Sequence, residues 1–191
     1  MPSDTPPGNL IVFADFKCIA QGSTADVLAQ LRERKDDTPY LVFNEQTGEL
    51  LDFDLHNRAG AVAHAASAET AEEAPRGVGR PKLGVVAREV TLLPRHWDWL
   101  NRQPGGASVA LRRLVQEASR VNADRDAVRA SREAAYRFMT AIAGALPGFE
   151  EATRALFAGE RERFEALIGS WPADLRIHLQ KLSAAGWSTT A

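Results

Sequence analysis

The sequence predicts an α+β protein with a small N-terminal α+β unit, a central strand-helix-helix segment and a C-terminal helical bundle. Residues 9–17 and 40–54 are rich in β-branched and aromatic residues, which favours strands. From residue 88 onward, apolar residues recur mostly at helical spacing. With 45% hydrophobic residues in 191, the chain is able to bury a substantial core.

The N-terminal unit, expected over residues 1–56, places one helix between strands. Ser23 or Thr24 is typical of a helix N-cap, and aliphatic residues follow it on one helical face. Thr47 and Gly48 stand between two apolar runs of the second strand region, which predicts a hairpin turn.

Residues 57–79 are rich in alanine and hold almost no large apolar side chain, so we expect a linker there. The C-terminal helical region is expected over residues 124–191. After one helix that Pro147 and Gly148 stop, three short helices are predicted, over residues 149–158, 160–170 and 173–184.

Several protein classes are excluded by composition. No run of about 18 apolar residues occurs, so no transmembrane helix and no membrane partner are expected. The first nine residues are polar and proline-rich, which is unlike a secretory signal. Cys18 is the only cysteine, so no internal disulfide forms, and a reducing cytoplasm is the expected compartment.

The charge distribution singles out the middle of the chain. Residues 76–132 hold 12 Lys and Arg against 5 Asp and Glu, whereas residues 1–75 hold 5 against 13. A basic segment between less basic flanks suits a polyanionic partner. Packing of the basic segment on the acidic N-terminal part of the same protein explains the asymmetry equally well.

The segment "REVTLLPRHWDWLNRQPGGASVALRRL" begins at Arg88 and has the order strand, proline, helix, glycines, helix. It resembles the ribbon-helix-helix DNA-binding unit over about 35 residues, and we place such a unit at residues 80–123. The resemblance implies two chains whose strands pair and enter the major groove. It also implies a DNA phosphate at the start of the second helix, near Gly106, Ala107 and Ser108.

Strand alternation departs from the ribbon-helix-helix pattern. The positions that face DNA in that family are occupied here by Leu92, Val90 and Arg88. The positions that face the core hold Leu93, Thr91 and Glu89. Either a bulge shifts the alternation or the strand is buried on its other face, and both outcomes favour phosphate contacts over base contacts.

Just before this segment, "RGVGRPKLG" resembles the Gly-Arg-Pro core of an AT-hook, in which an arginine enters a narrow A·T minor groove. A solvated end of the linker is the alternative. Together, the two resemblances and the local charge give eight candidate DNA-binding residues: Arg76, Arg80, Lys82, Arg88, Gly106, Ser108, Arg112 and Arg113.

A broader resemblance covers nearly the whole chain. The stretches that begin "GRPKLGVVAREV" and "AAYRFMTAIAGALPGFEE" are similar to a bacterial family known as domain of unknown function 2239. This resemblance implies a bacterial origin and a soluble protein. It implies no activity, cofactor or catalytic residue.

No pattern in the chain predicts catalysis. The four histidines are far apart in sequence, none has a second ligand at metal spacing, and Cys18 lacks a local nucleophile signature. We therefore expect no enzyme, no catalytic residue, no metal and no cofactor.

The leading interpretation is a DNA-binding protein or transcriptional regulator. The alternative is a protein-interaction or dimerisation protein without nucleic-acid binding, and an enzyme of unrecognised type comes third. In the first two interpretations we expect a homodimer through residues 88–121, because a lone strand leaves its hydrogen bonds unmade. Four side chains are expected to be buried in this region: Trp97, Leu100, Leu111 and Leu114.

Overall fold

The computed structural model describes residues 8–34, 38–52, 86 and 88–187. The contacts between residues divide the chain into two compact units. One consists of residues 1–63 with 122–191, and the other of residues 64–121. The expected linker at residues 57–79 lies outside the described residues, as does part of the expected central unit.

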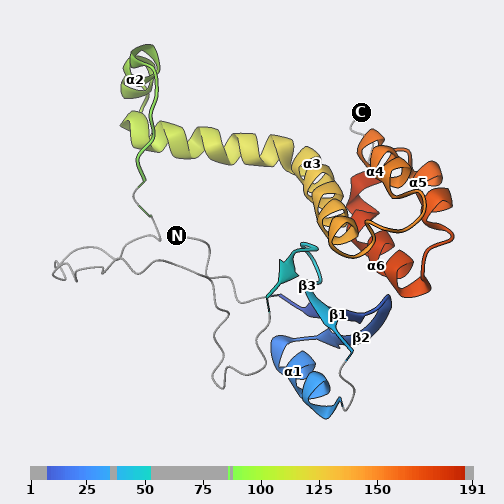
Figure 1. Cartoon of the computed structure of the whole chain (residues 1–191). Coiled ribbons are helices and arrows are strands. Elements are labelled where there is room, and N and C mark those ends of the chain that lie inside the picture. Colours follow the sequence, from blue (N-terminus) through green and yellow to red (C-terminus); the bar gives the residue numbers. More distant parts are fainter. Residues whose placement is uncertain (1–7, 35–37, 53–85, 87, 188–191) are drawn as a thin grey trace. The chain divides into compact units, whose positions relative to one another are not determined.

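A four-stranded antiparallel sheet forms the centre of the first unit (Figure 1). Its strands are β1 (Leu10–Ala14), β2 (Lys17–Gly22), β3 (Tyr40–Asn44) and β4 (Leu50–Leu51), in the order β2-β1-β3-β4. Helix α1 (Thr24–Glu33) lies between β2 and β3 in sequence, and the Ser23 side chain accepts a hydrogen bond from the Asp26 N–H, which confirms one of the two expected caps. The expected turn between β3 and β4 is also present.

One prediction about the strands was wrong. The sequence indicated a single strand over residues 9–17, but the chain turns at Asp15 and Phe16 and returns as β2. The segment Lys17–Gly22 lacks the alternation of apolar and polar residues that marks a half-buried strand. Its pairing with β1, and not its own pattern, makes it a strand.

Helices supply the rest of the first unit. Helix α3 (Gly106–Ile142) contributes its C-terminal part and is followed by α4 (Phe149–Ala158), α5 (Arg161–Ile168), α6 (Ala173–Ser183) and the 3-10 turn η1 (Ala184–Trp187). The three short C-terminal helices are thus confirmed to within two residues. The α+β fold class with a C-terminal helical region is confirmed as well.

Helix α3 is longer than the sequence predicted. We expected two helices divided near residue 123, but α3 runs unbroken for 37 residues. No proline and no glycine interrupts residues 107–142, and the weak helix formers Asn122, Asp124 and Asp126 each cost only a fraction of a kcal/mol. Arg129 also pairs with Asp126 at 2.8 Å one turn away, which supports the helix there.

The two faces of the sheet bury separate cores. Leu10 and Val12 of β1 pack with Val27 and Leu31 of α1 on one face. The intervening residues Ile11 and Phe13 pack on the other face, in the core that the C-terminal helices share. Because successive strand residues point to opposite faces, β1 is buried throughout, and the sheet lies between α1 and the C-terminal helices.

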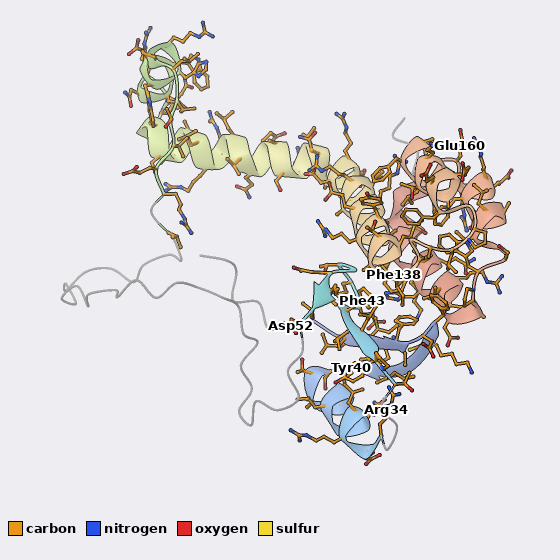
Figure 2. All side chains as sticks on the ribbon, viewed as in Figure 1. Arg34, Tyr40, Phe43, Asp52, Phe138 and Glu160 are labelled. Atoms are coloured by element: carbon orange, nitrogen blue, oxygen red, sulfur yellow. The ribbon has the colours of Figure 1, made fainter. Side chains whose placement is uncertain are left out.

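This packing changes the domain division. We expected separate regions at residues 1–56 and 124–191, but Phe13 and Phe43 of the sheet share one core with Phe138 and Leu179. Figure 2 shows Phe43 of β3 facing Phe138 of α3, and their ring centroids are 4.8 Å apart. The N-terminal strands and C-terminal helices therefore form one unit whose two halves are distant in sequence.

The imidazole of His178 on α6 completes this aromatic cluster. Its ring centroid is 4.7 Å from that of Phe138 and 6.0 Å from that of Phe13, and the residue is only 1% exposed. Neither of its ring nitrogens has a hydrogen-bond partner among the described residues. Burial lowers the pKa of His178 from 6.5 to about 4, because the charged imidazolium loses its hydration.

We expect the stability of this unit to fall as the pH drops from about 6.5 to about 4, and to lose nothing further through His178 below that range. The unfolded chain takes up the proton first, since its imidazole has the higher pKa. The shift corresponds to roughly 3 kcal/mol. His178→Leu should abolish this loss, measured by urea unfolding at neutral pH and near pH 4.5. The exposed His96→Gln serves as control, and an unchanged pH dependence in His178→Leu would contradict the assignment.

The turn before β4 approaches α3 closely at Gly48, where φ is 63° and a Cβ would overlap the Ala134 carbonyl oxygen. We expect Gly48→Ala to destabilise the unit by more than about 2 kcal/mol, because backbone atoms must move as well as strain being introduced. Gly148→Ala, at φ 74° with only ordinary contact to Leu167, should cost about 1 kcal/mol. Equal losses in urea unfolding would show that the close approach is unimportant.

Candidate functional site

The candidate site lies in the second unit, in residues 88–121, and is built on two helices. Helix α2 (Pro94–Asn101) starts at a proline, whose fixed φ suits the first helical turn and whose missing N–H costs nothing there. A turn over residues 102–105 separates it from α3, and the Gly106 N–H donates to the Gln103 carbonyl oxygen at 2.9 Å. Leu100 and Ala110 are the buried hydrophobic residues of this described stretch.

The expected strand at residues 88–93 is not present. These residues belong to no sheet, and all four strands of the described chain lie between Leu10 and Leu51. A strand needs a neighbour for its backbone hydrogen bonds, and one copy of the chain offers none to this segment. The ribbon-helix-helix resemblance is therefore not confirmed.

The candidate DNA-binding residues fall into two groups. Arg76, Arg80 and Lys82 lie outside the described residues. Arg88, Ser108, Arg112 and Arg113 are all exposed, and Arg112 Nη1 donates to Ser108 Oγ at 3.1 Å. Gly106 is a correction: its N–H already donates to Gln103, so it is not available to a phosphate in this conformation.

The arginines of this stretch lack acidic partners. Among the described residues, no carboxylate forms a salt bridge with any arginine from residue 88 to residue 113, that is with Arg88, Arg95, Arg102, Arg112 or Arg113. In the C-terminal helices, by contrast, Arg154, Arg161 and Arg163 each pair with a nearby glutamate. Within the described part of the chain, the central arginines are thus exposed and form no salt bridge, and we call them the uncompensated arginines.

Large apolar side chains are also exposed in this stretch. Their exposed fractions reach 66% at Val115 and Val121 and 49% at Trp99, and the set is completed by Val90, Leu93, Val109 and Leu114. The expected burial holds for Leu100 only, since Trp97 and Leu111 are half-buried and Leu114 is exposed. Helical spacing in the sequence predicts that apolar residues share one side of this helix, but it does not show whether another part of the described chain covers them.

We call this surface the α3 stripe, defined by Leu111, Leu114, Val115, Ala118 and Val121. Each of these positions has another of the set three or four residues away, so they lie along one side of the helix. Arg112, Arg113, Gln116 and Arg120 occupy the opposite side. The helix therefore presents an apolar side and a basic side to its surroundings.

Features that would support catalysis are weak in the described residues. Burial raises the pKa of the Cys18 thiol, with the Asp174 carboxylate adding to the effect, so the thiol stays protonated and is a poor nucleophile. No group of three or more His, Cys, Asp or Glu able to hold a metal occurs in the described part of the chain. None of the described helices combines the length and the hydrophobicity that a membrane span requires.

Comparison with known proteins gives one result. The model of the family described as "Uncharacterized protein conserved in bacteria (DUF2239)" matches residues 9–183, which include the sheet, the α3 stripe and nearly all of the C-terminal helices. No match was found among curated proteins or among solved structures. Because the matched region extends over most of its length, the chain belongs to the bacterial family DUF2239.

Proposed function

We propose that this protein acts as a homodimer-forming interaction protein, in which the α3 stripe of one copy packs against the α3 stripe of a second copy. The observation that carries the proposal is the exposure of this stripe, with Val115 and Val121 each 66% exposed. Soluble monomers rarely expose contiguous apolar surface of this kind, and such surface commonly marks a protein interface.

Helix α3 itself supports a helical partner. Its C-terminal part carries the same three-and-four spacing at Ala135, Met139 and Ile142, and there the side chains pack into the core of the first unit. Side chains at this spacing are thus buried where another element of the fold covers the helix. Leu114, Val115 and Val121 remain exposed among the described residues, and a second copy supplies an identical stripe with the right spacing for helix-to-helix packing.

The energetics favour a reversible dimer over an obligate one. Covering the three exposed large side chains of the stripe, Leu114, Val115 and Val121, contributes about 1 kcal/mol each in each copy, or roughly 6 kcal/mol for the dimer. Association costs about 4 to 15 kcal/mol in lost translational and rotational freedom. Because the two figures are of similar size, burial of these side chains does not by itself set the affinity, and we propose reversible association.

The unchanged protein should show twice the 20.8 kDa chain mass in light scattering at micromolar concentration, and a monomer on dilution. Leu114→Glu with Val121→Glu should abolish the dimer, because charges on the stripe cannot be buried unpaired. Gln116→Glu with Ala123→Glu introduces the same charge at the same spacing on exposed positions away from the stripe, and should leave the dimer intact. A monomeric unchanged protein, or equal behaviour of both variants, would remove the proposal.

DNA binding is the second candidate, and the uncompensated arginines favour it specifically. Lys and Arg that neutralise phosphates release condensed counterions, which drives binding without base recognition. Arg112, Arg113 and Arg120 lie on the side of α3 away from the stripe, and Arg120 already pairs with Glu117, so a dimer packed through the stripe leaves the first two free for phosphate. Without a strand at residues 88–93, base readout has no support, and the proposed binding is sequence-independent.

Replacing Arg112 and Arg113 with glutamine should weaken binding to all duplexes and reduce the salt slope by about one unit per lost phosphate contact. Fluorescence anisotropy across a salt series, on A·T-rich and G·C-rich duplexes, measures both quantities. The control is Arg161→Gln with Arg163→Gln, because these arginines are already paired with Glu165 and Glu160. Absence of binding at low salt would falsify the DNA candidate while leaving the dimer proposal untouched.

A further inference from the structure

A hollow of about 260 Å³ lies in the first unit, between the β1–β2 turn, the beginning of β3 and the C-terminal end of α3. Its walls include Asp15, Phe16, Tyr40 and Ile142. None of its lining residues belongs to the α3 stripe or is one of the uncompensated arginines, and neither of the functions proposed above makes use of it.

The β1–β2 turn gives the hollow its charged and aromatic rim. Ala14 pairs with Lys17, so the turn consists of Asp15 and Phe16 alone. Asp15 has φ 45°, the one positive φ outside glycine among the described residues. Left-handed backbone is unfavourable for a residue with a side chain, although aspartate tolerates it better than most. The turn thus holds a carboxylate beside a phenyl ring that is 37% exposed, in a conformation that the backbone alone does not favour.

The charge and the exposed ring of the lining select a cation. Among the described residues that line the hollow, Asp15 is the one charged side chain and Phe16 supplies an exposed aromatic ring, whereas Phe13 is buried in the core and Tyr40 packs on the α1 side of the sheet. An aromatic face attracts cations through its quadrupole, and a carboxylate adds direct charge complementarity. The Arg34 guanidinium carbon lies 6.0 Å from the Tyr40 ring centroid (Figure 2), so this ring already attracts a cation outside the hollow.

The lining also selects the kind of cation. Calcium and magnesium require about six oxygen ligands, and a single carboxylate with apolar neighbours does not provide them. Leu41 and Ile142 offer apolar surface on which a short methylene chain can lie. The volume is below the range of about 300 to 1,000 Å³ typical of drug-sized ligands. We therefore infer that the hollow binds an alkylammonium group, which a small free amine or the lysine side chain of a partner polypeptide can supply.

The test titrates the full-length protein with n-butylammonium chloride and follows backbone amide NMR signals. Saturable shifts at Asp15, Phe16 and Tyr40 are expected, with a dissociation constant on the order of millimolar, because the site is shallow and open to solvent. n-Butanol is the neutral control and should shift these signals far less. Shifts of equal size with n-butanol, or no shifts with either compound, would overturn the inference.

Variants test whether the Asp15 carboxylate contributes to binding without disturbing the rest of the fold. Asp15→Asn removes the charge but keeps the turn, since asparagine tolerates positive φ, and should weaken butylammonium binding roughly three- to tenfold. Glu49→Gln removes an exposed charge from the same unit outside the hollow and should leave binding unchanged. Phe16→Leu should weaken binding through loss of the exposed ring. Unaltered affinity in Asp15→Asn, with an otherwise unperturbed spectrum, contradicts the assignment.

A final arm distinguishes the two sources of the ligand. An acetylated and amidated Ala-Lys-Ala tripeptide presents the same ammonium group on a polypeptide. Tighter binding of the tripeptide than of butylammonium supports a protein partner, whereas weaker binding supports a free amine, and both outcomes uphold the alkylammonium site. Failure of both ligands overturns it.

Discussion

The contact of Phe13 and Phe43 with Phe138 and His178 is the interaction on which the first unit depends. It joins the inner face of the N-terminal sheet to α3 and α6, more than 90 residues away in sequence, and buries all four rings. Without it the sheet would expose Ile11, Phe13 and Phe43, and the C-terminal helices would lose one wall of their core. A four-stranded sheet with one covering helix has too little core to be stable when its other face is open to water.

The buried His178 ring makes this contact sensitive to pH. An apolar side chain of similar size would fill the same place without leaving two ring nitrogens unsatisfied. The buried imidazole contributes ring contacts at neutral pH, where it is uncharged. It destabilises the unit only when it must take up a proton. Acid therefore destabilises the join between the strands and the helices through His178.

Helix α3 connects the fold to the proposed function. One amphipathic pattern runs along this helix. In the C-terminal part of the helix, the apolar side chains are buried in the core around Phe138 and Met139. The N-terminal part has the same spacing but leaves Leu114 and Val121 exposed, while Arg112 and Arg113 project from the other side and form no salt bridge with a described carboxylate. Because the apolar side and the basic side lie on opposite sides of one helix, the proposed dimer and the proposed polyanion binding would not compete for the same surface.

The sequence by itself determined the features that depend on neighbouring residues. The Ser23 cap, the turn at Gly48, the proline start of α2 and the limits of α4 to α6 all follow from local signals, and the α+β class follows from them. Only the tertiary structure decided the rest. Strand β2 exists through its pairing with β1, and residues 88–93 remain outside any sheet for want of such a neighbour. Which apolar stripe is buried, and hence where a candidate interface lies, depends on contacts between residues far apart in sequence, and periodicity carries no information about those contacts.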